Sequence, residues 1–147
     1  MICYAVIDTN VLVSALLTSK NDAATVQVVQ KMLSGEIIPV YSKEITKEYR
    51  EVLHRKEFGF SSELVGYLLS AIEQFGILME PSPSGVTLPD MNDLPFYEVV
   101  LEKRNRNNEG YLVTGNKKHF PIEPFIVTPN ELLEILNRKS IDPVTAL

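Results

Sequence analysis

Short apolar runs alternate with longer segments of helical periodicity along almost the whole chain. The apolar runs are bounded by polar or turn-forming residues, a pattern typical of strands that are covered on both faces of a sheet. We predict strands over residues 3–7, 37–41, 77–79, 111–114 and 124–127.

Apolar residues recur at helical spacing between these strands. The segment 63–75 carries a core stripe formed by Leu64, Leu68, Leu69, Ile72 and Phe75. The last helix has a clear start signal, because Thr128 can cap it, Pro129 fits its first turn and Glu131 completes a capping box. We predict helices over residues 11–17, 23–33, 43–54, 63–75, 96–103 and 129–137.

Strands that alternate with helices favour right-handed crossovers and a parallel sheet. We therefore expect an α/β fold, a three-layer α/β/α sandwich around a central, mainly parallel sheet. The 147 residues contain no repeat and no linker long enough to separate domains. We expect one domain over residues 1–139 and a C-terminal tail over residues 140–147.

The only cysteine, Cys3, excludes an intramolecular disulfide and a cysteine metal cluster, and it suits a reducing compartment. It is expected to be a small buried residue of the first strand. The apolar start of the chain breaks at Asp8, too early for a signal peptide, and no apolar run approaches the ~20 residues of a membrane span. We expect a cytoplasmic protein that does not insert into membranes.

The net charge of −5, from 14 basic and 19 acidic residues, argues mildly against unselective binding to nucleic acid. That argument weakens if the acids are clustered around divalent cations. With four carboxylates at such a site, the rest of the surface would carry only about −1. Net charge therefore does not decide the function.

Ligands of an open parallel sheet bind beyond the carboxyl ends of the strands, so polar residues that follow strands are candidates for chemistry. Residues 8–10 follow the first strand, residues 114–116 follow the fourth, and residues 90–93 open the helix before the fourth strand. Each segment also has a purely structural interpretation. Asp8 or Asn10 could cap one helix, Asp93 could cap another, and residues 115–116 could form a turn with positive φ.

Glu48 is a fourth candidate, on the predicted helix 43–54. At 3.6 residues per turn it lies roughly 85° from the centre of the apolar face, whereas Glu44 and Glu51 lie roughly 125° and 145° away. Its carboxylate could reach an interior cleft while the other two face water. The alternative is a surface residue paired with Lys47 or Arg55.

Four ordered motifs resemble a known family. They are Asp8-Thr9-Asn10, Glu48-Tyr49-Arg50-Glu51-Val52-Leu53, Asp90-Met91-Asn92-Asp93-Leu94-Pro95-Phe96 and Tyr111-Leu112-Val113-Thr114-Gly115-Asn116. Together they are similar to a PIN domain, over residues 1 to about 136. The likeness is greatest to the PIN-type toxins of bacterial and archaeal toxin–antitoxin modules.

The resemblance implies a metal-dependent endoribonuclease that uses Mg²⁺ or Mn²⁺. Asp8, Glu48 and Asp93 match the catalytic acids of the family, and Asp90 matches an accessory acid. Supporting positions are Asn10 and Thr114, whose hydroxyl would line the site. Asn116 departs from the pattern, because the family most often has a further aspartate there.

The residue types themselves suit this chemistry, since hard divalent cations prefer carboxylate oxygens. We expect Asp8 to be the central ligand, with Asp93 beside it and Glu48 binding directly or through water. Asn116 could offer an amide oxygen without charge, so a second metal should bind weakly in the free protein and fill only with substrate.

Basic residues near the predicted site are candidates for substrate binding. Lys117 and Lys118 follow Asn116 at the active end of the sheet, and we assign them to RNA. The run 103–106 is interpreted as a solvated helix end that complements the helix dipole. For His119 we expect a loop residue without a role, and for His54 an exposed one.

Other functions have weaker support. A receiver domain would need an aspartate after the third strand, a dehalogenase-type phosphatase would need an acid at position 10, and a glycine-rich phosphate loop is missing from the sequence. The main alternative is a catalytically weak or inactive PIN-like module that binds RNA or protein. By analogy with the toxins we expect an antitoxin that blocks the acidic cleft, and a homodimer to which the 63–75 helix contributes.

Overall fold

The computed structural model describes residues 2–140 of the chain. The strands within this range form one parallel sheet of five strands, in the order β3-β2-β1-β4-β5. Their bounds are β1 (Cys3–Ile7), β2 (Ile37–Tyr41), β3 (Ile77–Leu78), β4 (Tyr111–Val113) and β5 (Ile126–Val127). The predicted parallel sheet is confirmed, with the first strand of the chain at its centre.

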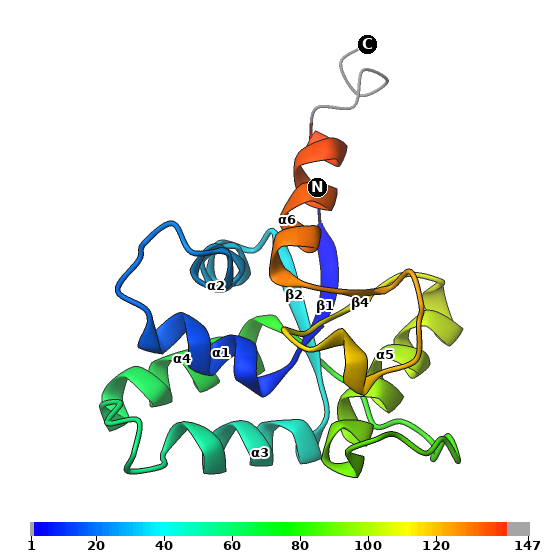
Figure 1. Ribbon diagram of the computed structural model, residues 1–147, viewed down its shortest axis with the longest axis horizontal. Coiled ribbons are helices and arrows are strands. Elements are labelled where there is room, and N and C mark those ends of the chain that lie inside the picture. The colour runs from blue at the N-terminus through cyan, green and yellow to red at the C-terminus, as the bar shows by residue number, and fades with distance from the viewer. Residues whose placement is uncertain (1, 141–147) are drawn as a thin grey trace.

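Six α-helices surround the sheet within the same range. They are α1 (Thr9–Leu17), α2 (Ala24–Ser34), α3 (Lys43–Leu53), α4 (Ser62–Phe75), α5 (Leu94–Asn107) and α6 (Pro129–Ser140), with the short 3₁₀ helices η1 (Met91–Asp93) and η2 (Lys117–His119). Figure 1 shows α5 on one side of the strands, α1, α2 and α4 on the other, and α3 across the ends of β1 and β2. The predicted three-layer α/β/α sandwich is confirmed.

Local hydrogen bonds explain where several helices begin. Ser42 caps α3 through the backbone N–H of Ile45 at 3.2 Å. The predicted capping box of α6 is present, because Glu131 N–H donates to the Thr128 hydroxyl at 3.1 Å and Thr128 N–H donates to Glu131 at 2.9 Å. α1 begins two residues earlier than predicted because Asp8, rather than Asn10, is its N-cap.

Buried aromatic residues fix α3 and α5 at the carboxyl end of the sheet. Tyr49 of α3 and Phe96 of α5 are almost fully buried, and their ring centroids lie 6.2 Å apart. The Tyr49 hydroxyl also donates a hydrogen bond of 2.5 Å to the carbonyl oxygen of Ile7, the last residue of β1. Burial of side chains of this size contributes about 1.5–3 kcal/mol each, so these contacts hold both helices firmly.

Lys103 corrects one prediction, because its side chain is buried rather than solvated. Its ammonium lies 4.2 Å from the ring centroid of Tyr4, donates to Asn107 Oδ1 at 3.0 Å and forms an ion pair with Glu109 at 3.5 Å. The end of α5 packs against the start of β1, so the aliphatic stem is covered while the charge finds partners.

Other local predictions have mixed outcomes. Cys3 is buried, and burial raises the pKa of its thiol to about 11, which keeps it an unreactive core residue. His54 is exposed, as predicted. The alternative interpretation of residues 115–116 as a turn with positive φ is wrong, since Asn116 has φ −136° and Gly115 is not among the positive-φ glycines of the described range.

Within residues 2–140, no helix combines the length and apolarity that crossing a bilayer requires. The predicted tail begins with Ser140, which is the last residue of α6, and residues 141–147 lie outside the described range.

Candidate functional site

Strands β1 and β4 are neighbours in the sheet, and they bring together two parts of the candidate site that lie far apart in the sequence. Their register pairs Ile7 with Val113, and the backbone N–H of Asp8 donates to the Val113 carbonyl at 2.9 Å. Asp8 and Thr114 therefore lie side by side at the carboxyl edge of the sheet. This is where ligands of parallel sheets bind.

Asp8 is a buried carboxylate, 7% exposed, with hydrogen-bond donors on both oxygens. Its Oδ1 accepts from the backbone N–H of Asn10 at 3.4 Å, and its Oδ2 accepts from the Thr114 hydroxyl at 2.8 Å. Burial raises the pKa of Asp8, and the hydrogen bond from Thr114 opposes that shift. The residue thus caps α1 and also presents a charge to the site; the Asn10 side chain is exposed.

Glu48 comes from α3 and accepts a hydrogen bond from the hydroxyl of Thr9, a buried residue in the first turn of α1. It is partly buried, while Glu44 and Glu51 are exposed, as the helical geometry predicted. Burial raises the pKa of Glu48, the charges of Asp8 and Asp93 raise it further, and the Thr9 hydrogen bond opposes them. The alternative of a surface ion pair with Lys47 or Arg55 is therefore not what the structure shows.

Asp93 is the last residue of η1 and occupies the N-cap position of α5, but its side chain makes no capping hydrogen bond, so the capping interpretation is wrong for this side chain. Its Oδ2 instead lies 2.9 Å from His119 Nδ1. Burial raises the pKa of Asp93, as does the charge of Asp8, whereas His119 lowers it. Asp90 has the capping role here, because its Oδ1 accepts from Asn92 N–H at 3.0 Å at the start of η1.

His119, which the sequence predicted to be a loop residue without a role, has two specific partners. η2 turns the chain back, so that the imidazole lies between Asp93 and Asn116, whose Nδ2 is 2.9 Å from His119 Nε2. Donor atoms of Asp90, Asp93 and His119 all lie within 4.8 Å of one another, a spacing that could hold a metal ion. Sequence reasoning missed this residue because only the tertiary fold places it beside Asp93, 26 positions away.

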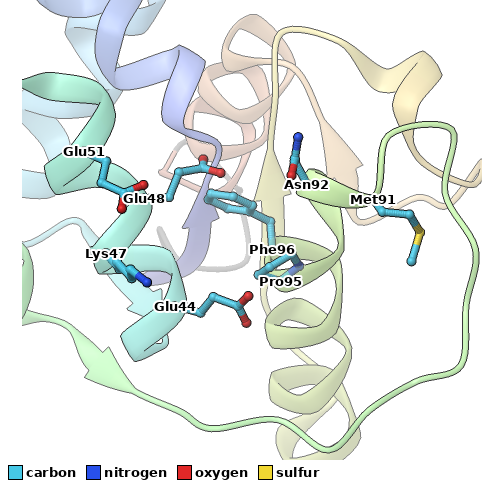
Figure 2. Close-up of a pocket in the computed structure, with 8 residues that line it drawn as sticks. All are labelled: Glu44, Lys47, Glu48, Glu51, Met91, Asn92, Pro95 and Phe96. Atoms are coloured by element: carbon cyan, nitrogen blue, oxygen red, sulfur yellow. The ribbon is translucent and has the colours of Figure 1, made fainter. Parts of the chain in front are cut away.

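A groove of about 240 Å³ opens beside Glu48, between α3 and the start of α5. Its lining residues are Glu44, Lys47, Glu48, Glu51, Met91, Asn92, Pro95 and Phe96 (Figure 2). Three of the four charged side chains are acidic. Lys47 also lines the groove, a place that could not be predicted from sequence because it depends on how α3 packs against α5.

The two lysines assigned to substrate differ in their surroundings. Lys117 forms an ion pair with Glu131 at 3.0 Å, the same glutamate that completes the capping box of α6. Lys118 is exposed, and among residues 2–139 it has no ion-pair partner. Of the two lysines, Lys118 can therefore bind a phosphate without first breaking an ion pair, whereas Lys117 would have to leave Glu131.

The donor set fits a hard divalent cation. Three carboxylates, Asp8, Glu48 and Asp93, gather here from separate parts of the chain. Beyond the effect of burial, the charge of Asp8 raises the pKa of both Glu48 and Asp93, and the charge of Asp93 also raises that of Glu48. Within the described range, Glu48 Oε1 and Asp93 Oδ1 have no hydrogen-bond partner and are available as ligands. Carboxylates that are crowded and partly desolvated without a neutralising charge are suited to Mg²⁺ or Mn²⁺.

The sequence was compared with models of known protein families. Residues 4–118 match the family model described as "PIN domain", which covers most of the chain and ends one residue before His119. Proteins of this type are generally nucleases that use divalent metals. No curated protein and no solved structure matches the chain at a significant level.

Proposed function

The chain belongs to the PIN domain family, and from this premise we propose that it is a metal-dependent endoribonuclease acting as the toxin of a toxin–antitoxin module. The observation that carries the proposal is the group of three carboxylates at the carboxyl edge of the sheet. Each accepts a hydrogen bond from a neighbouring side chain: Asp8 from Thr114, Glu48 from Thr9 and Asp93 from His119.

Mg²⁺ or Mn²⁺ would be held by Asp8, Glu48 and Asp93. When bound, the ion would offset charge on the scissile phosphate and activate a water for attack. The protein's own contribution is to fix the carboxylates before substrate arrives. Thr114 and the α1 backbone restrain Asp8, while Thr9 restrains Glu48, so little reorganisation is needed at the moment of reaction.

RNA is the proposed substrate, and its phosphates require more positive charge than the groove beside Glu48 supplies, since Lys47 is outnumbered there by three glutamates. Lys118, next to the site and exposed, is the better candidate for a phosphate contact, with Lys117 contributing if it exchanges Glu131 for RNA. The three glutamates of the groove beside Glu48 repel phosphate. We therefore expect the RNA backbone to pass on the β4 side of the site.

Protein partners are part of the proposal. An antitoxin would block the acidic cleft, and a second copy of the chain would cover an apolar groove of about 210 Å³ between α1, α2 and α4. Its lining includes Leu16, Val29, Leu33, Leu64 and Tyr67, and Tyr67 is 65% exposed. Apolar surface of this kind is typical of an interface. The proposed site of action is the cytoplasm.

Cleavage of total RNA by the purified protein tests the proposal, with Mn²⁺, with Mg²⁺ and with chelator. We expect metal-dependent fragments from the wild type, none from Asp8→Asn, and undiminished cleavage by Asp22→Asn, which changes an exposed acid on the loop before α2. Expression without the antitoxin should slow growth, and Asp8→Asn should abolish that effect. Absence of cleavage from folded protein under all conditions would favour an inactive RNA- or protein-binding module instead.

A further inference from the structure

The side chains of Asp93, His119 and Asn116 form a short hydrogen-bonded chain that leads away from the carboxylate cluster. His119 Nδ1 lies 2.9 Å from Asp93 Oδ2, and His119 Nε2 lies 2.9 Å from Asn116 Nδ2. The Asp93 side chain is 15% exposed and the His119 side chain 39% exposed, so the chain runs from the interior of the site to its rim.

The proton positions along this chain follow from the chemistry of the groups. The amide nitrogen of Asn116 can only donate, so the Nε2 atom of His119 accepts. A neutral imidazole with an accepting Nε2 carries its proton on Nδ1, and that N–H points at the Asp93 carboxylate. Asn116 therefore fixes the tautomer of His119 that donates to Asp93.

We propose that His119 is a positioning residue that orients Asp93 for metal binding, and that Asn116 acts on the site through His119 rather than as a metal ligand. The inference rests on the proposed function, because it assumes that Asp93 binds the metal. It revises the expectation that the Asn116 amide oxygen is a ligand.

Two observations favour positioning over direct ligation by His119. Both ring nitrogens are already in use, so neither has a lone pair free for a metal unless a hydrogen bond breaks. Asp93 is bonded to His119 through Oδ2, which leaves Oδ1 available to the ion. Hydrogen bonds that hold a ligating carboxylate in this way commonly control metal affinity.

The test measures Mn²⁺ binding by calorimetry, without RNA, in wild type, His119→Leu and His119→Asn. Leucine removes both polar atoms, and we expect it to weaken Mn²⁺ binding about 10- to 100-fold. Asparagine can place its amide nitrogen near the position of Nδ1, so it should restore most of the affinity. Circular dichroism of the metal-free variants checks that each is folded.

A double-substitution cycle separates the two possible roles of Asn116. If Asn116 acts through His119, Asn116→Ala weakens Mn²⁺ binding in the wild-type background and has no further effect in His119→Leu. If the amide oxygen is a ligand, the same fold-change appears in both backgrounds, which would overturn the proposal for Asn116.

Spectroscopy of the bound ion provides the second readout. Electron spin echo modulation of protein-bound Mn²⁺ should show no directly coordinated nitrogen, and a coordinated nitrogen lost in His119→Asn would make His119 a ligand and overturn the proposal. Equal Mn²⁺ affinity in wild type and His119→Leu would overturn this inference alone. A wild-type protein that binds no Mn²⁺ would overturn the proposed function together with it.

Discussion

The hydroxyl of Thr114 donates a 2.8 Å hydrogen bond to the carboxylate of Asp8, although the two residues lie 106 positions apart in the chain. Thr114 is fully buried, and its oxygen also accepts from the backbone N–H of Asn116 at 3.1 Å. One hydroxyl thus connects the end of β1, the end of β4 and the turn into η2. Both the stability of the fold and the geometry of the site therefore depend on this hydroxyl.

Thr114→Val should therefore damage both properties. Valine has nearly the same shape but no donor, so it leaves a buried carboxylate oxygen without a partner, at a cost of about 1–3 kcal/mol in the free energy of unfolding. Urea denaturation measures the loss, and Mn²⁺ titration should show weaker binding. Thr114→Ser keeps the hydroxyl and should retain most of both; an equally stable Thr114→Val would show that the contact contributes little.

Asp8→Asn should separate stability from activity. Asparagine is as good an N-cap as aspartate, so α1 keeps its start, and the substitution removes a buried charge whose pKa is raised by burial. We expect no RNA cleavage but a metal-free melting temperature equal to or above that of the wild type. Differential scanning calorimetry in chelator provides the measurement, and a clearly lower melting temperature would contradict the explanation.

The three site carboxylates should also give the metal-free protein a characteristic pH dependence. The pKa values of Asp8, Glu48 and Asp93 are raised in the folded state, so folded protein holds these protons more tightly than unfolded chain. As pH rises above about 4 through the raised values, the unfolded chain loses its protons first and the free energy of unfolding falls. Above the raised values all three groups are ionised and the loss is complete.

A variant with all three carboxylates changed to amides, Asp8→Asn with Glu48→Gln and Asp93→Asn, isolates this effect from other titrating groups. Its stability advantage over the wild type, in chelator, should grow between about pH 4 and pH 7. Added Mn²⁺ should reverse the order at pH 7, since metal binds the ionised carboxylates of the wild type only. An advantage that stays constant with pH would contradict the assignment.

Lys118→Ala should weaken RNA binding more than Lys117→Ala does. Lys118 is exposed near the site, whereas Lys117 is held by Glu131. Loss of one phosphate contact should raise KM and reduce the salt dependence of cleavage by about one charge. Lys20→Ala, in the exposed loop before α2, is the matched control. Glu131→Gln keeps a capping side chain but releases Lys117, so it should lower KM if Lys117 contacts RNA.

The sheet and most of the helices could be predicted because their signals are local. Apolar runs mark β1, β2 and β4, and the capping residues at Thr128 and Glu131 mark the start of α6. The position of Glu48 at the border of the α3 apolar face was also readable from 3.6-residue periodicity. These features depend only on residues within one element.

Contacts that depend on packing between distant elements could not be predicted. Lys103 is buried because α5 ends against Tyr4, and no pattern within 103–106 indicates that neighbour. His119 meets Asp93 because η2 folds back over the sheet edge, which neither residue's surroundings reveal. Sequence reasoning therefore indicated the acids of the site but missed the imidazole beside them.

The strand order has a consequence for synthesis of the chain. β1 occupies the centre of the sheet, yet β4, which pairs with its second edge and leads to Thr114, is synthesised only after β2, β3 and helices α1 to α5. A nascent chain carries Asp8 and Glu48 long before Asp93, Thr114 and His119 exist. For a protein proposed to cut RNA, assembly of the site is postponed until the segment that carries Thr114 and His119 has been synthesised.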